Sequence, residues 1–528
     1  MRIRLKPFGG IIPKADPHYL PDSAAVTAQN CKFTSGSLEA WKNPLTVNTP
    51  LKVGTKTSIY LYEDQYWLHW VDLDVNVAKS PMATDAFKRI YWTGDGAPKM
   101  SVLEAITTGG TAYPNNSYLL GVPAPAMAPT VSVVGSITDP DPTLVESRAY
   151  VYRYVSAYGE AGPPSSASVT VDVAPGQSVD ITNMSVAPVG NYNIATKEIF
   201  RSNTGSSDTA YQLAGSVAVA TTTFSDTVDS ADLGEVLDSL LWDVPPTDLK
   251  GLIALPNGCL AGYSGNELCY SVPYQPHAWP LNQRWPVADT IMGIGSYGMT
   301  VLVTTDGAPC IATGQDPTDV TIERLENGYA CTLKLGVVDM GYAVAYPSTG
   351  GLMSAGVNGV ELITRDILSK DDWQALGLTK AYFYGGLYIG FGTTTFIFNP
   401  ATKDLATLSG ITATAGFHDP ATGELYLMVG SNIVKWDAGV GYLTYTWKSK
   451  PFVSEKPINM SCARVYADTY PVTLKLYVDA TLKHTQTVLN NLVFRLPLGF
   501  RGTEIAAQVE GTVNVYAVDI AESVGEMK

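Results

Sequence analysis

The chain has 528 residues, more than a single hydrophobic core usually organises, so its length predicts two to four domains. Hydrophobic residues make up 45% of the sequence and charged residues only 16%, a balance that excludes a disordered chain. The formal net charge of -15 argues against a protein that grips nucleic acid through its phosphates, because such binding needs clustered Lys and Arg. Residues 127–250 carry most of this excess, with 15 acidic against 5 basic side chains.

The sequence predicts neither membrane insertion nor a signal peptide. No window approaches the roughly 20 apolar residues that a membrane-spanning helix needs. The basic start is followed by a short apolar run that ends at Pro13, too short for the apolar region of a signal peptide. We therefore expect a protein that is soluble where it is made.

The first expected element is an N-terminal arm over residues 1–49. Its stretch "YLPDSAAVTAQNCKFTSGSLEAW" predicts a short helix, in which Ala24, Ala25 and Ala28 permit close packing, and then a hairpin anchored by Trp41. This segment is expected to dock either on a neighbouring protein or on its own first blade. The basic residues before it suit a phosphate or an acidic partner, or else an arm that pairs with a strand; they are Arg2, Arg4, Lys6 and Lys14.

Alternation with a period of two predicts strands in most of the remaining chain. Residues 50–126 form the first expected propeller blade, where "SIYLYEDQYWLHWV" places a turn at Glu63 and Asp64. Residues 127–235 read as about seven short strands separated by Gly, Pro and Ser, which is typical of a β-sandwich. Within them, "YRYVSAYGEAGPPS" resembles the strand, turn and strand of a fibronectin type III domain.

Residues 236–440 repeat a layout of three strands with Gly- or Asp-bearing turns about every 40 residues, which is typical of propeller blades. Two of these units are "IMGIGSYGMTVLVTTDGAPCIATG" and "AYFYGGLYIGFGTTTFIFNP". One helix is expected here. Ser369 would cap it, Asp372 stands at the capping-box spacing, and Trp373 and Leu376 share a face.

Residues 441–528 alternate again and predict a C-terminal β-sandwich. The segment "PVTLKLYVD" places four apolar residues on one face of a strand, namely Val472, Leu474, Leu476 and Val478. The predicted fold is therefore all-β. It is a β-propeller of about six blades, with a fibronectin- or immunoglobulin-like sandwich inserted after the first blade and a second sandwich at the C-terminus.

The side chains that most often perform chemistry are scattered. The cysteines include no C-x-x-C pair, so we expect buried thiols in a reducing cytosol, with a disulfide between Cys259 and Cys269 as the alternative. The full set is Cys31, Cys259, Cys269, Cys310, Cys331 and Cys462. The histidines have no metal-ligand spacing; they are His18, His69, His277, His418 and His484.

Three acidic pairs lie on expected turns or a helix start, where neighbouring carboxylates point in different directions. They are Glu63 with Asp64, Asp139 with Asp141, and Asp371 with Asp372. A glycosidase needs two carboxyl groups that face each other across a sugar, and a calcium loop needs a longer ligand series. The sequence therefore predicts no catalytic residue, no cofactor site and no metal site, and the protein is not expected to be an enzyme.

Several segments, taken in order, resemble one family of proteins. They are "IIPKADPHYLPDSAAVTAQNCKFTSGSLEAWKNP", "NGCLAGYSGNELCYSVPYQPHAWP", "GVELITRDILSKDDWQAL" and "VFRLPLGFRGTEIAAQVEGTVNVYAVDIAES". The order is similar to that of tail nozzle proteins, of the tail tubular protein B type, from short-tailed bacteriophages. In that family an opening of the form "LPDxAAxxAxN...SGxLxxW" precedes a propeller. The similarity spans most of the chain except residues 127–230.

The resemblance implies a structural protein of the virion tail, made in the cytoplasm of the host bacterium. Its copies would form a homohexameric ring below the portal and the adaptor, or head–tail connector, and tail fibres or tailspikes would attach outside. Double-stranded DNA would pass during genome ejection without tight binding, because an acidic lumen repels phosphates. Residues 313–336 would gate this channel or serve as an ordinary connection between blades.

Two other functions stay open at the level of sequence. Aromatic clusters such as "YWLHW" and "QPHAWPLNQRW", together with the inserted domain, would suit a receptor- or glycan-binding tail fibre or baseplate component. At strand spacing, however, such clusters favour core packing. A polysaccharide-degrading propeller enzyme is the third alternative, and it would need convergent acids that the sequence does not indicate.

Overall fold

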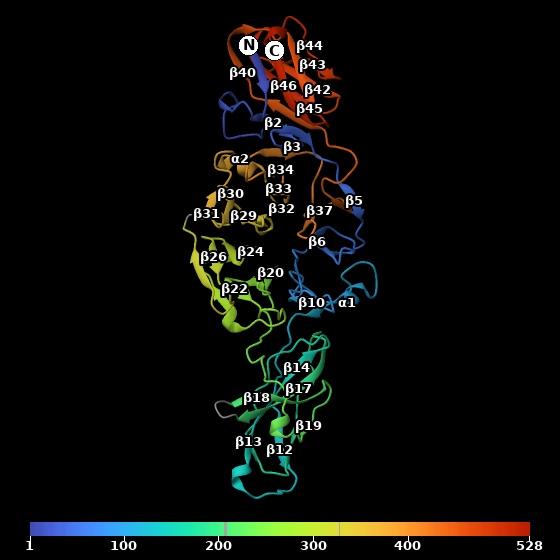
Figure 1. Cartoon of the computed structure of the whole chain (residues 1–528), viewed down its shortest axis with the longest axis vertical. Coiled ribbons are helices and arrows are strands. Elements are labelled where there is room, and N and C mark those ends of the chain that lie inside the picture. Colours follow the sequence, from blue (N-terminus) through green and yellow to red (C-terminus); the bar gives the residue numbers. More distant parts are fainter. Residues whose placement is uncertain (205–208, 327, 528) are drawn as a thin grey trace.

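The computed structural model describes residues 1–204, 209–326 and 328–527, which form an all-β protein with 6% helix and 46% strand. Many small sheets follow one another along an elongated molecule (Figure 1). Three parts stack along its long axis: an end module that carries both chain termini, a ring of sheets in the middle, and an insert at the opposite end (Figure 1).

The ring consists of seven antiparallel units: five separate four-stranded sheets, one two-stranded sheet, and four strands that form part of a larger sheet. The first two are β6 (Lys56–Tyr62) with β7 (Tyr66–Val71), and β8 (Asn76–Lys79), β9 (Ile90–Thr93), β10 (Lys99–Ser101) and β11 (Tyr118–Leu119). The next two are β20 (Lys250–Ala254), β21 (Leu260–Ser264), β22 (Glu267–Tyr270) and β23 (Arg284–Pro286), and β24 (Ile291–Tyr297), β25 (Thr300–Thr305), β26 (Cys310–Thr313) and β27 (Thr321–Arg324).

The remaining ring sheets follow in sequence. They are β28 (Val338–Asp339), β29 (Ala343–Ser348), β30 (Gly351–Gly356) and β31 (Gly359–Leu362); β32 (Lys380–Tyr384), β33 (Leu387–Phe391), β34 (Thr395–Phe398) and β35 (Leu405–Leu408); and β36 (Ala415–Asp419), β37 (Glu424–Val429) and β38 (Asn432–Lys435) with β5 (Leu45–Asn48). Because β5 comes from the N-terminal segment, the last sheet is completed by a strand from the other end of the chain.

Packing between neighbouring sheets returns to its starting point. The β20, β24, β28, β32 and β36 strands lie against one another in that order, and β36 lies against β6. The two-stranded sheet shares an apolar cluster with β9, in which the rings of Trp70 and Trp92 lie 5.9 Å apart. Finally, β8 lies against β20, which closes the order.

Residues 50–126 form two sheets where the sequence predicted one blade. The predicted turn at Glu63 and Asp64 is confirmed, because both have positive φ, 50° and 52°, between the paired residues Tyr62 and Tyr66. The prediction of a single blade is wrong for the segment that follows β7. After β7, the chain turns at Asp72 and begins a separate sheet, so the aromatic strands β7 and β9 pack face to face instead of pairing edge to edge.

The insert holds eight strands in three small sheets. These are β12 (Thr130–Val134), β16 (Ser178–Thr182) and β19 (Phe224–Asp226); β13 (Glu146–Arg148) and β15 (Val171–Val173); and β14 (Tyr150–Ser156), β17 (Ile194–Thr204) and β18 (Thr209–Ala218). Every residue of β14 is buried. Its three tyrosines join residues of β16 and β17 in one apolar cluster, so the core of the insert lies between the sheets.

The end module combines the two ends of the sequence. One sheet contains β1 (Arg2–Leu5), β3 (Cys31–Thr34), β4 (Ser37–Ala40), β41 (Cys462–Ala467), β44 (Phe494–Arg495) and β46 (Val515–Ala521). The other strands are β2 (Ala25–Gln29), β39 (Tyr445–Ser449), β40 (Phe452–Ile458), β42 (Val472–Val478), β43 (Thr481–Val488) and β45 (Gly502–Gly511). Strand β42 alternates as predicted, with its four apolar residues at 472, 474, 476 and 478 buried.

The predicted short helix at Ala24, Ala25 and Ala28 is wrong, because these residues lie in or next to strand β2. Strand β2 pairs with β35 of the ring on one side and with β39 of the end module on the other. These bonds outweigh the helix propensity of alanine, and the small side chains, 4% exposed or less, fit the core on one face. The result is a continuous ten-stranded sheet that runs from the ring into the end module.

Two short α-helices are present in the described part of the chain, α1 (Leu103–Thr107) and α2 (Lys370–Ala375). The predicted helix start is confirmed, because Ser369 and Asp372 form a capping box at the start of α2. Trp373 is buried and its indole N–H donates to the carbonyl of Ser348 at 2.9 Å. Short 3-10 helices span Pro17–Tyr19, Pro142–Leu144, Ser230–Asp232, Leu281–Gln283, Lys334–Gly336 and Val524–Met527.

Candidate functional site

All six cysteines are buried and free, so a disulfide between Cys259 and Cys269 is wrong. Cys259 precedes β21, whereas Cys269 on β22 lies opposite Gly262, so the two thiols are out of register. Burial raises the pKa of the Cys259 thiol and of the Cys269 thiol to about 12. Protonated buried thiols are poor nucleophiles, and these cysteines act as small apolar residues of the core.

The five histidines lie in five separate places. In the described ranges, no group of three or more His, Cys, Asp or Glu side chains is arranged to hold a metal ion. His18 contacts Asp16 at 2.9 Å and Glu504 at 3.2 Å, and these carboxylates raise its pKa. His69 is buried between the carbonyl of Trp67 and the backbone of Lys52, and burial lowers its pKa.

The three acidic pairs serve local structure. Glu63 and Asp64 form the turn between β6 and β7. The Asp139 carboxylate accepts from the backbone N–H of Asp141 at 3.1 Å, and Asp141 caps the following 3-10 helix. Asp371 and Asp372 lie in the first turn of α2, where acidic side chains complement the helix dipole.

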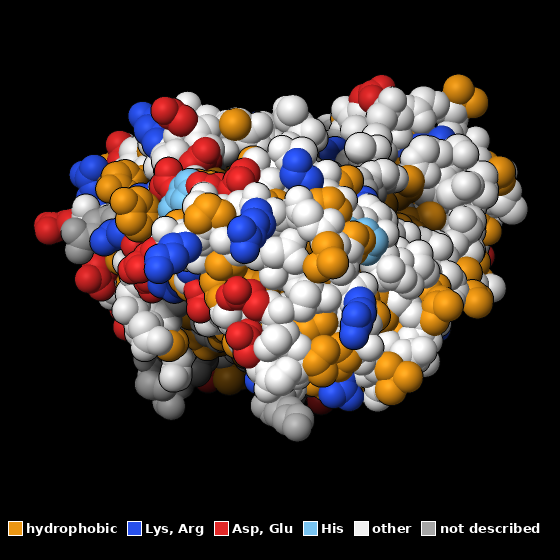
Figure 2. Space-filling model, turned by 90° about the horizontal axis from the view of Figure 1, so that it is seen from above, with side chains coloured by type: hydrophobic (Ala, Val, Ile, Leu, Met, Phe, Trp, Pro, Cys, Tyr) orange, Lys and Arg blue, Asp and Glu red, His pale blue; other side chains and the backbone are white. Residues whose placement is uncertain are grey.

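Three of the four basic residues at the N-terminus, Arg2, Arg4 and Lys14, are engaged within the chain. Strand β1 pairs with β46, Arg2 makes an ion pair with the buried Asp519 at 2.9 Å, and Arg4 lies 3.7 Å from the same carboxylate. The Lys14 ammonium donates to the carbonyl of Arg365 at 2.6 Å. Seen from the end that carries both termini, basic and acidic side chains are interspersed (Figure 2). These contacts match the alternative in which the basic arm pairs with a strand.

Residues 313–336 lead from the end of β26 through β27 to the 3-10 helix at Lys334; Asn327, inside this stretch, lies outside the described residues. The Lys334 ammonium contacts the carboxylate of Asp74 and the side-chain oxygen of Asn76, the latter at 2.9 Å. This segment is therefore tied across the ring to the β8 sheet.

A cavity of about 320 Å³ opens where the innermost strands of the ring meet. Strands β6, β28, β32 and β36 contribute to its wall, and the tie between Lys334 and Asp74 lies at its edge. Desolvation raises the pKa of Asp339 and lowers the pKa of His418, whose ring lies edge-on against Phe383 at 4.9 Å. This cavity has the size of a small-molecule site, far too small for a DNA duplex.

A buried polar network joins the ring to the insert. Arg89 of the ring contacts Asp85 at 2.8 Å and Glu160 of the insert at 3.5 Å. Burial raises the pKa of Glu160 to about 7, and Arg89 opposes the shift. Nearby, His277 is 3% exposed, and burial lowers its pKa to about 3. The joint therefore holds several ionisable groups away from water.

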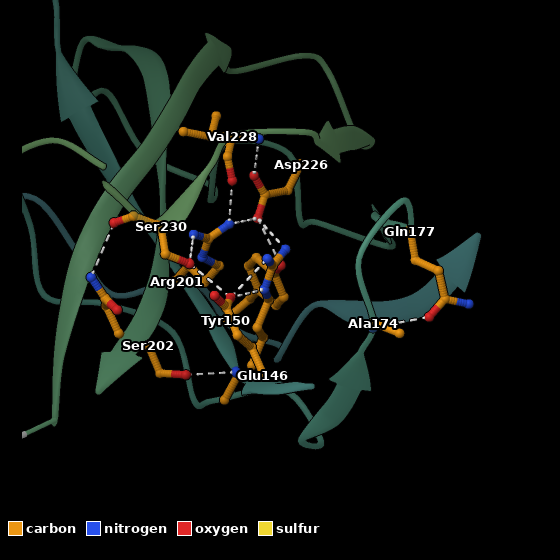
Figure 3. Close-up of polar contacts among 12 residues, drawn as sticks. Glu146, Tyr150, Ala174, Gln177, Arg201, Ser202, Asp226, Val228 and Ser230 are labelled. Atoms are coloured by element: carbon orange, nitrogen blue, oxygen red, sulfur yellow. Dashed lines mark hydrogen bonds and ion pairs between the residues drawn. The ribbon is translucent and has the colours of Figure 1, made fainter. Parts of the chain in front are cut away.

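A second buried network lies inside the insert (Figure 3). The Asp226 carboxylate on β19 accepts from the Tyr150 hydroxyl at 2.7 Å and pairs with Arg201 on β17 at 2.9 Å. Arg201 also donates to the hydroxyl of Ser230 at 2.9 Å and to the carbonyl of Val228 at 2.7 Å. Because β19 and β17 belong to different sheets, the network fixes one sheet against the other.

Sequence reasoning missed both networks. Glu160 and Arg201 looked like ordinary residues of a turn and a strand, and their partners lie 71 and 25 positions away in the sequence. The sequence did carry one usable signal, because charged residues are scarce. Arg201 lies within the expected strand "KEIFRSNTG", and an arginine that is buried in a strand needs a carboxylate partner.

Comparisons with known proteins assign no family. No family model matches the sequence, and no curated protein matches it. Among solved structures, the chain is similar to one titled "Crystal structure of BBS1N in complex with ARL6DN, soaked with mercury", with 11% identity, a TM-score of 0.24, and coverage of 49% of this chain and 83% of that chain. A similarity this low carries no argument. The described helices include none long and apolar enough to cross a membrane.

Proposed function

We propose that the protein is a structural component of a bacteriophage tail, of the nozzle type. Copies of the chain form a homohexameric ring that extends the ejection channel below the portal and adaptor, and tail fibres or tailspikes attach to its outside. The protein is made in the host cytoplasm, belongs to the virion tail and has no catalytic role. The sequence resemblance motivates this proposal. The closed order of the ring sheets and the sheet that the ring shares with the end module support it.

The ring is proposed to be a β-propeller of seven blades, and the insert and the end module are proposed to be β-sandwiches. The closed packing order of the seven sheets supports the first part. The pairing of β38 with the outer strand β5, which comes from the other end of the chain, also supports a propeller. Propellers are commonly closed by one distant strand in this way, and closure leaves few free strand edges. The two sheets of residues 50–126 raise the expected number of blades from about six to seven.

The observation that carries the structural role is the ten-stranded sheet through β2. It joins the ring to the end module by backbone hydrogen bonds on both edges of one strand, where a flexible linker would let the modules swing. Side chains reinforce the same place: Asn30 donates to the hydroxyl of Ser409 and to the carbonyl of Thr444, both at 3.0 Å. Such a joint suits a part that bears internal pressure.

The proposed route of DNA lies between copies of the chain. The cavity where the innermost strands of the ring meet holds about 320 Å³ and has the contact of Lys334 with Asp74 at its edge, so a duplex has no passage through a single chain. The acidic net charge of -15 suits a lumen that repels phosphates.

Electron microscopy of the purified protein mixed with the adaptor of the same tail tests this proposal. We expect a six-fold ring with a central hole on the adaptor. DNA binding measured at two salt concentrations should be no tighter than the non-specific range of about 10⁻⁴ to 10⁻⁶ M, with a shallow salt dependence. Failure to bind the adaptor, or tight and salt-sensitive DNA binding, contradicts the proposal.

A further inference from the structure

A cleft of about 430 Å³ lies where the insert meets the ring. The ring supplies α1 and the residue that follows it, Thr108, together with Asn116 and Tyr118, and the insert supplies Tyr158 and Asn191. The two parts are held together at this point, since the N–H of Leu119 donates to the carbonyl of Asn191 at 2.8 Å. Clefts between modules are the usual place for small-molecule sites, and this volume is within their range of about 300–1,000 Å³.

The cleft presents hydrogen-bond acceptors that the described protein atoms do not use. The Asn116 amide donates to the carbonyl of Thr108 at 3.0 Å, and the Asn191 amide donates to the carbonyl of Ser117 at 3.0 Å. These bonds fix both side chains, yet neither side-chain oxygen accepts a hydrogen bond from another described residue. The Glu104 carboxylate is exposed in the same cleft.

Aromatic rings form the other element of the cleft. The rings of Tyr118 and Tyr158 lie 5.8 Å apart, and their hydroxyls are 3.4 Å apart. The Phe87 ring packs against Tyr158 with a centroid distance of 4.9 Å, and Phe87 is 41% exposed. The two tyrosines line the cleft and Phe87 adjoins them, with ring planes inclined by 64° and 58°, so together they form an uneven apolar platform with the tyrosine hydroxyls as polar tips.

This combination selects a class of ligand. Three acceptor groups favour a molecule with several O–H donors, and the aromatic platform favours one with an apolar face. The lining residues include no Lys or Arg, and the carboxylate of Glu104 repels anions. A phosphate, a sulfate or an acidic sugar is therefore disfavoured.

We propose that this cleft binds a neutral saccharide. Its hydroxyl groups donate to the side-chain oxygens of Asn116 and Asn191 and to the carboxylate of Glu104, and its C–H face packs against the tyrosines. The inference goes beyond the structural role proposed above. It does not depend on that role, because the cleft lies within one chain.

Saturation-transfer NMR on the full chain tests the inference. The neutral probes are glucose, galactose and N-acetylglucosamine, and the charged probes are glucuronic acid and glucosamine. We expect signals from at least one neutral probe and none from glucuronic acid. The double variant Asn116→Ala with Asn191→Ala should weaken the binding about tenfold or more, since two hydrogen bonds to the ligand are lost.

Two further variants keep the test decisive. Glu104→Gln removes a charge from an exposed side chain, so the fold is unaffected and the neutral probe should bind about tenfold more weakly. Asn490→Ala removes an exposed asparagine of the end module and should change nothing. The inference is overturned if no neutral probe binds, if binding persists unchanged in both cleft variants, or if glucosamine alone binds.

Discussion

One buried carboxylate organises the insert at the scale of single residues. Asp226 is 0% exposed and faces Arg201, which is 1% exposed, and Tyr150 (Figure 3). A buried ion pair adds little net stability, because desolvation offsets the attraction, but an unpaired buried charge is costly. The pair therefore determines how the sheet of β19 faces the sheet of β17 more than how strongly the two adhere.

Replacement of Asp226 by Ala should destabilise the insert by about 3–5 kcal/mol, because the Arg201 charge stays buried without its partner. Hydrogen exchange of the β14 and β17 amides in the full chain measures this. The double variant Asp226→Leu with Arg201→Met should recover part of the loss, because neither charge is then buried. A loss below about 1 kcal/mol in the single variant would contradict this account.

The joint between ring and insert should respond to pH through Glu160. Burial raises its pKa from 4.5 to about 7. The folded state thus holds the proton more tightly than the unfolded chain, so this stabilisation is complete below about pH 4.5 and falls as the pH rises through 7. The upper limit of the loss is about 3 kcal/mol.

Thermal unfolding of the full chain at pH 5, 6, 7 and 8 checks this effect. We expect the wild-type transition of the joint to fall with rising pH more than that of Glu160→Gln, which has no carboxyl group to ionise. Glu104→Gln, at an exposed site, is the matched control and should follow the wild type. If the transition temperatures of the wild type and of Glu160→Gln fall in parallel with rising pH, Glu160 is not the group responsible.

At the scale of elements, β2 is the strand on which two modules depend. It lies between β35 and β39, and its bulge places Val26 outside the ladder, since Ala25 and Thr27 pair with consecutive residues of β39. Val26 is 40% exposed, whereas Ala28 is 1% exposed. The strand therefore has one position, Val26, that should tolerate substitution, and others whose side chains fill the core.

Proline substitutions at Ala28 and at Val26 should distinguish the core position from the exposed one. Ala28→Pro removes a backbone donor in the middle of a sheet and should cost about 3 kcal/mol or more. Hydrogen exchange should then rise in β35 and β39 together, because one strand stabilises both. Val26→Pro makes the same change at the bulge, where proline is better tolerated, and should cost much less. Equal effects of the two substitutions would show that β2 does not hold the modules together in this way.

At the scale of the whole molecule, the sequence predicted the elements with local signals. The alternation of β42, the turn at Glu63 and the capping box at Ser369 are each encoded within a few residues, and each is confirmed. The strand β2 was missed because its alanines favour a helix locally, and only partners about 380 and 420 positions away make it a strand.

The site was less predictable than the elements for a related reason. The cleft brings together Glu104, Asn116, Tyr158 and Asn191, and none of these residues stands in a motif. Their meeting depends on how the insert is mounted on the ring, which no local pattern encodes. At "QPHAWPLNQRW" the sequence favoured core packing over glycan binding, and Trp279 there is fully buried.

The pairing of the two chain ends sets the order in which a new molecule can be completed on the ribosome. Strand β1 pairs with β46 and β5 pairs with β38, so these two N-terminal strands have no partner until nearly 400 or more further residues have been made, whereas β3 and β4 pair with each other early. At about 5–20 residues per second, synthesis of the whole chain takes roughly half a minute to two minutes. During that time the N-terminal strands expose unpaired edges, which makes them natural clients for a holding chaperone.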